Sequence, residues 1–120
     1  MPTALITGIT GQDGAYLSQF LLDKGYAVHG LLRRSASAEV IGERLRWLGV
    51  LDRVTLHDGD LMDLSAILRI VETVQPDEVY NLAAQSFVHA SWQQPILTGN
   101  VTGLGAVNML EAVRLVARKA

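Results

Sequence analysis

Two hydrophobic periodicities alternate along the chain. Short apolar runs rich in β-branched residues are typical of buried strands, and longer stretches repeat apolar residues at helical spacing. The first helical stretch shows this spacing at Tyr16, Leu17, Phe20 and Leu21. The pattern predicts strands at 3–7, 27–32, 53–60 and 78–84, and helices at 13–24, within 35–52, from 63 or 65 to 74, and from 98 to 118.

Residues that begin or end helices flank these segments. Gly25 fits the C-terminal stop of the first helix, and Asp63 and Ser65 are two candidate N-caps of the third. Pro76 ends that helix, because proline disfavours helical backbone in the residue before it. Regular alternation of strand and helix predicts an α/β fold with a Rossmann-type parallel sheet. Right-handed crossovers give the strand order 3-2-1-4, with helices on both faces.

Composition narrows the class of protein. The 120 residues suit one domain, 1–120, and a chain that is 49% hydrophobic and 18% charged predicts a packed core. A net charge of −2 argues against nucleic acid as a partner, and the chain has no cysteine for disulfides or thiolate metal sites. Because it has neither a basic, apolar leader nor a membrane-spanning run, we expect a cytoplasmic protein without membrane partners.

Three glycines mark the junction between the first strand and the first helix. The stretch ITGITGQDG places Gly8, Gly11 and Gly14 at a Gly-x-x-Gly-x-x-Gly spacing. A pyrophosphate needs backbone N–H groups at close range and gains from the partial positive charge of a helix N-terminus. Glycine permits that approach, so the motif predicts a dinucleotide site; the alternative is a purely structural turn.

An arginine pair follows the second strand. In NAD-binding versions of such a site, an acidic residue near this position accepts a hydrogen bond from the ribose 2′-hydroxyl. Here Arg33 and Arg34 stand in its place, and guanidinium groups suit a 2′-phosphate. The sequence therefore favours NADP over NAD, the alternative being a solvated basic pair.

Other candidate residues follow the third and fourth strands. Asp60 can accept a hydrogen bond from the adenine amino group while Leu61 packs on the ring, and the fourth strand ends beside the glycine turn. His57 with Asp58, Asp60 and Asp63 admits a metal site, but turn and cap roles explain these residues. We therefore predict no metal ligands. His89 and Trp92 suit either substrate contact or loop anchoring.

The segments TGITGQDGAYL, GLLRRS, DGDL, PDEVYNLAAQSFV and EAVR together resemble the extended short-chain dehydrogenase/reductase superfamily. Within it, the Gln12-Asp13 pair makes the chain similar to the GDP-mannose 4,6-dehydratase family. The resemblance covers only the first part of a typical member, so it implies a truncated Rossmann-type domain without the C-terminal sugar-nucleotide domain. Carried over by position, the cofactor contacts are Gly8, Ile9, Thr10, Gly11, Gln12, Asp13, Gly14, Arg33, Arg34, Asp60, Leu61, Leu82, Ala83, Ala84, Gln85 and Ser86.

The resemblance implies an NADP-dependent lyase that converts GDP-mannose to GDP-4-keto-6-deoxymannose through internal hydride transfer and loss of water. It also implies a homo-oligomer, in which helices from this side form a bundle between subunits. The family's Tyr-x-x-x-Lys pair is absent, because Phe20 and Leu115 stand four residues before the two lysines. We therefore assign no catalytic residue and expect this chain alone to be inactive. The alternatives are a free-standing, non-catalytic NADP-binding module and a fragment of a related sugar-nucleotide epimerase or reductase.

Overall fold

The computed structural model describes residues 1–32, 43–82 and 103–118. Its strands form one four-stranded sheet in the order β3-β2-β1-β4, and every neighbouring pair is parallel. This arrangement confirms the predicted Rossmann-type order 3-2-1-4. The strands are β1 (Thr3–Thr7), β2 (Ala27–Leu32), β3 (Val54–Asp58) and β4 (Glu78–Asn81).

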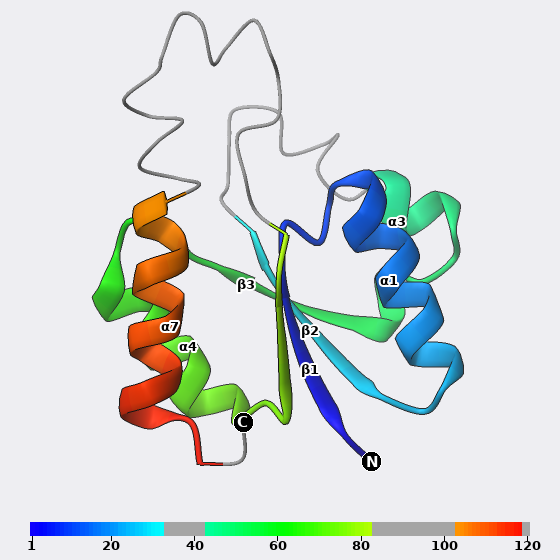
Figure 1. Cartoon of the computed structure of the whole chain (residues 1–120). Coiled ribbons are helices and arrows are strands. Elements are labelled where there is room, and N and C mark those ends of the chain that lie inside the picture. The colour runs from blue at the N-terminus through cyan, green and yellow to red at the C-terminus, as the bar shows by residue number, and fades with distance from the viewer. Residues whose placement is uncertain (33–42, 83–102, 119–120) are drawn as a thin grey trace, which may run out of the picture.

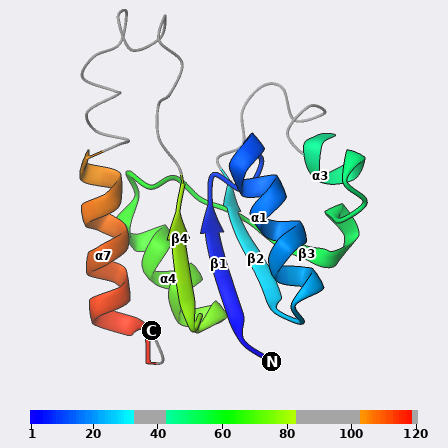
Figure 2. The same cartoon turned by 45° about the vertical axis from the view of Figure 1, so that its right-hand side comes forward.

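Helices cover both faces of the sheet, as predicted. Figure 1 shows α1 and α3 on one side of the sheet and α4 and α7 on the other, and Figure 2 shows α7 and α4 beyond β4. A short 3-10 helix, η1 (Leu51–Arg53), leads into β3. The α-helices are α1 (Gln12–Asp23), α3 (Glu43–Trp47), α4 (Leu64–Val74) and α7 (Gly105–Val116).

Two apolar clusters, one on each face, hold these layers together. Ala4 and Ile6 of β1 belong to the cluster beneath α1, while Leu5 belongs to the cluster beneath α4 and α7. Alternate residues of a strand point to opposite faces, so β1 is buried on both sides, as a central parallel strand requires. All three of these side chains have no exposed surface.

Strand register aligns the carboxyl ends of the sheet. Thr7 is paired with Leu31 of β2 and with Asn81 of β4, and Leu32 is paired with Asp58 of β3. The segments that leave β1, β3 and β4 therefore emerge along one edge. In open α/β sheets this is the edge at which ligands bind, where the strand order reverses between β1 and β4.

The C-terminal end of α1 and both ends of α4 agree with the predictions. After α1, the N–H of Gly25 donates to the Leu22 carbonyl (3.0 Å) and that of Tyr26 to the Leu21 carbonyl (3.0 Å), a Schellman motif that confirms the predicted stop. Of the two candidate caps of α4, the structure selects Asp63, whose Oδ1 accepts from the Ala66 N–H at 3.3 Å. The helix ends at Val74, as predicted.

Several boundaries differ from the predictions. The third strand ends at Asp58 instead of residue 60, because the Asp63 N–H donates to the Asp60 carbonyl (2.8 Å) and turns the backbone. The last helix, α7, is preceded by a π-helical turn at residues 103–104 and ends at Val116 instead of residue 118. Predicted segments at 35–42, 83–84 and 98–102 lie outside the described residues.

Candidate functional site

The turn between β1 and α1 has the geometry that a phosphate-binding loop needs. Gly8 has a φ of 70°, a conformation that disfavours other residues, and its carbonyl accepts from the Gly11 N–H at 3.0 Å. Gly11 is the N-cap of α1, and no side chain caps the helix there. The backbone N–H groups of the first helical turn are therefore available to an anion, which the helix dipole also favours.

Gly14 brings α1 against this turn. A Cβ on Gly14 would overlap the Gly8 carbonyl oxygen and would lie 2.7 Å from the Cα of Ile9. Both obstacles belong to the backbone, so a side chain at this position could not be accommodated by a change of rotamer. The structure thus gives Gly14 the close-packing role expected of the third glycine in a dinucleotide-binding motif.

A surface depression of about 300 Å³ lies at this turn. It joins the start of α1 to the end of β4, whose following residue Leu82 is exposed. The structure therefore brings together the predicted residues of the glycine turn and the first residue after β4. The depression is lined by Gly8, Gly11, Gln12, Asp13, Gly14 and Leu82.

Two other residues of the predicted set have buried side chains. Ile9 has no exposed surface and packs in the cluster beneath α1, so only its backbone can face a ligand. Leu61 is 6% exposed and packs in the cluster beneath α4 and α7. Its side chain therefore has little surface left to pack on an adenine ring.

Hydrogen bonds between β1 and β4 fix the end of β4 beside the glycine turn. The Thr7 hydroxyl donates to Oδ1 of Asn81, and the Leu82 N–H donates to the Thr7 carbonyl at 3.2 Å. Thr7 itself is fully buried. Sequence reasoning did not assign a role to Thr7 or Asn81, although a polar residue at the carboxyl end of each of two strands was a signal that could have found them.

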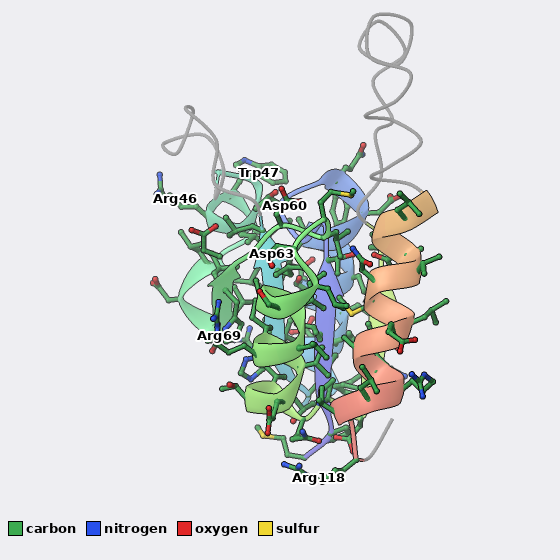
Figure 3. The ribbon with its side chains drawn as sticks, turned by 90° about the vertical axis from the view of Figure 1, so that its left-hand side faces the viewer. Arg46, Trp47, Asp60, Asp63, Arg69 and Arg118 are labelled. Atoms are coloured by element: carbon green, nitrogen blue, oxygen red, sulfur yellow. The ribbon has the colours of Figure 1, made fainter. Side chains whose placement is uncertain are left out.

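The loop between β3 and α4 lies at the same edge. Figure 3 shows Asp60 and Asp63 near the end of the molecule that carries Trp47, with Arg118 at the opposite end. Oδ1 of Asp60 accepts from the Met62 N–H at 2.9 Å. The Ser65 hydroxyl and the Ala66 N–H, which both donate to Asp63, lower the pKa of that carboxyl.

Histidines of β2 and β3 form a pair on this sheet. The His29 and His57 rings stack with centroids 5.2 Å apart, and Nδ1 of His29 lies 3.0 Å from Nε2 of His57. Burial lowers the pKa of both imidazoles, and the charge of His57 lowers that of His29 further. Within the described ranges, no group of three or more potential ligands is placed to hold a metal ion, so the cap role is the one the structure supports for Asp63.

Thr10 lies within the glycine turn and is half-buried. The other predicted site residues lie outside the described residues. These are Arg33, Arg34, Ala83, Ala84, Gln85 and Ser86, together with His89 and Trp92. Their roles stay predictions.

Solved structures of nucleotide-sugar enzymes share this fold. UDP-glucose 4-epimerase of Thermus thermophilus, in complex with NAD, matches with a TM-score of 0.76 and 30% identity over 93% of this chain and 33% of that chain. UDP-glucose 4-epimerase of Thermotoga maritima, with UDP-glucose, matches with a TM-score of 0.78 and 25% identity, and the match covers 92% of this chain and 33% of that chain. The fold and the glycine turn thus define a Rossmann-type α/β domain.

The chain belongs to the GDP-mannose 4,6 dehydratase family, whose family model matches residues 5–120. It is 49% identical over 120 residues to GDP-mannose 4,6-dehydratase of Yersinia enterocolitica, covering 96% of this chain and 32% of that protein. It is 50% identical over 117 residues to GDP-mannose 4,6 dehydratase 1 of Arabidopsis thaliana, and this match covers 92% of this chain and 32% of that protein. The chain therefore spans about a third of the length of these curated relatives. In the described part of the chain, no helix has the length and apolarity to cross a bilayer.

Proposed function

We propose that this chain is the NADP-binding part of a GDP-mannose 4,6-dehydratase. The observation that carries the proposal is the glycine turn, in which uncapped N–H groups at the start of α1 line a depression that also reaches the end of β4. Its size of about 300 Å³ is suited to part of a ligand, and the turn fits a pyrophosphate because no side chain caps the start of α1. Family membership supplies the substrate class.

Different residues bind different parts of the dinucleotide. The backbone N–H groups of Gln12 and Asp13, at the start of α1, bind the pyrophosphate, and Asp60 accepts from the adenine amino group. Leu82 contacts the middle of the dinucleotide, because Thr7 and Asn81 keep the end of β4 beside the glycine turn. Arg33 and Arg34 are proposed to bind the 2′-phosphate.

When bound, the dinucleotide would supply a reversible hydride acceptor for the family's reaction, in which a hydride leaves C4 of the mannose ring, water is lost across C5 and C6, and the hydride returns to C6 while C5 takes up a proton. This chain lacks the Tyr-x-x-x-Lys pair of the family, because Phe20 and Leu115 precede Lys24 and Lys119 by four residues. We therefore expect it to bind the dinucleotide without turning over GDP-mannose.

Calorimetric titration of the chain with NADP and with NAD tests the proposal. A guanidinium–phosphate pair is worth roughly 1.5–3 kcal/mol, so NADP should bind at least about tenfold more tightly than NAD. Arg33→Ala should abolish most of that preference while leaving NAD affinity unchanged. Arg118→Ala is the matched control, because Arg118 lies at the end of the molecule opposite Asp60 and Trp47 (Figure 3). Equal affinity of the unsubstituted chain for both dinucleotides would contradict the NADP assignment, and binding of neither would contradict the site.

A further inference from the structure

A side chain of α7 is bonded to the loop that follows β3. Nδ2 of Asn108 donates to the carbonyl oxygen of Leu61 at 2.7 Å, across 47 positions of sequence. Asn108 is half-buried, and Met109 beside it packs in the same cluster as the side chain of Leu61. Both the backbone and the side chain of Leu61 are thus held against the sheet and α7.

That carbonyl belongs to the peptide unit which also carries the N–H of Met62. The peptide unit is planar, so fixing the direction of its C=O also fixes the direction of its N–H. The Met62 N–H donates to Oδ1 of Asp60 at 2.9 Å. A continuous path of two hydrogen bonds therefore runs from the Asn108 amide through one rigid peptide group to the Asp60 carboxylate.

These two hydrogen bonds restrict the orientation of the Asp60 carboxylate, which is the proposed acceptor for the adenine amino group. A carboxylate at the surface of a loop can rotate about its side-chain torsions, and a hydrogen bond from a fixed N–H removes that freedom. Bonds arranged in series also polarise one another, which strengthens each of them. Without Asn108, the carbonyl of the Leu61–Met62 peptide would lose its hydrogen bond to α7, and only the packing of the Leu61 side chain and the Met62–Asp60 bond would limit rotation of the peptide.

We propose that Asn108 is a positioning residue for the nucleotide base: through the Leu61–Met62 peptide it orients the Asp60 carboxylate toward the adenine amino group. The inference rests on the proposed function, in which Asp60 accepts from that amino group. It extends the site to α7, an element that sequence reasoning had connected only with packing and association.

The test compares NADP with its hypoxanthine analogue, in which a carbonyl oxygen replaces the adenine 6-amino group. A correctly oriented carboxylate accepts from the amino group and repels the carbonyl, so the chain should prefer NADP by about tenfold. Asn108→Ala and the isosteric Asn108→Asp at pH 8 should each reduce this preference to less than about threefold. A loss of global stability alone would weaken both ligands equally and would leave the ratio unchanged, since both bind the same folded population.

Gln75→Ala is the matched control. The Gln75 side-chain amide also joins α4 to α7, since Nε2 donates to the Val116 carbonyl at 2.9 Å and Oε1 accepts from the Arg118 N–H at 2.9 Å. These bonds lie at the end of α7 away from Asp60, so the variant should keep the full preference for NADP. Asp60→Asn should remove the preference directly, and adding Asn108→Ala to it should change the ratio no further.

The possible results separate the two proposals. If the unsubstituted chain binds neither ligand, or binds both equally, the adenine contact of the proposed function is wrong and the role of Asn108 falls with it. If the unsubstituted chain prefers NADP and the Asn108 variants retain the whole preference, only the positioning role is overturned. Loss of the preference for NADP in Gln75→Ala would also overturn the positioning role of Asn108, because the preference would then depend on any bond between α4 and α7 and not on the bond to Leu61.

Discussion

At the scale of single residues, Gly14 allows a sharp prediction because the obstacles to a side chain are backbone atoms. We expect Gly14→Ala to lower the free energy of unfolding by about 1–3 kcal/mol, despite the higher helix propensity of alanine, since α1 must move away from the Gly8 carbonyl. The same displacement should weaken NADP binding. Urea denaturation and calorimetric titration measure the two effects.

Gly103→Ala is the control for this substitution, because a Cβ at that glycine would meet no atom within 4 Å. It should be neutral in both measurements. If Gly14→Ala unfolds at the same urea concentration as the unsubstituted chain, the close approach of α1 to the turn is wrong.

At the scale of secondary structure, the His29–His57 pair links the stability of β2 and β3 to pH. Burial lowers the pKa of both imidazoles in the folded chain, so the unfolded chain takes up protons more readily. The contribution of the pair is therefore complete above the ordinary pKa of about 6.5 and is lost as the pH falls through the lowered folded values. Thermal unfolding between pH 8 and pH 5 should show this loss, and His29→Gln with His57→Gln should flatten the profile in that window. An unchanged profile in the double variant would assign the pH dependence to other groups.

Elements and turns with a strong local signal were predictable from the sequence, while features that depend on contacts between distant or competing residues were not. β1 and β2 match the predicted ranges, because short apolar runs bounded by turns admit few alternatives. The selection of Asp63 over Ser65 as the N-cap of α4 depends on where the loop turns after Asp60, and a hydrogen bond within that loop decides it. Likewise, the glycine turn was recognisable from spacing. The Asn108–Leu61 bond joins segments 47 positions apart, so no local pattern could predict it.

At the scale of the whole molecule, α7 and β4 leave apolar and polar surface open at one side. Within the described residues β4 pairs only with β1, and an unpaired strand edge offers N–H and C=O groups to another chain. On α7, Leu110 is 69% exposed and Val107 is 57% exposed, beyond the face that packs on α4. Figure 2 shows α7 and β4 on the same side of the molecule.

We therefore predict that the chain self-associates through α7, through the β4 edge, or through both. Light scattering at micromolar concentration should give a mass above that of one 13.0 kDa chain. Val107→Glu with Leu110→Glu should reduce the mass to that of a monomer if α7 is the contact, because charged residues are costly to bury in an apolar interface. Trp47→Glu is the matched control, since Trp47 is 80% exposed but lies on α3, across the sheet from α7. Association that survives the α7 variant places the contact at the β4 edge, whereas a monodisperse monomer before any substitution would show that neither surface drives assembly.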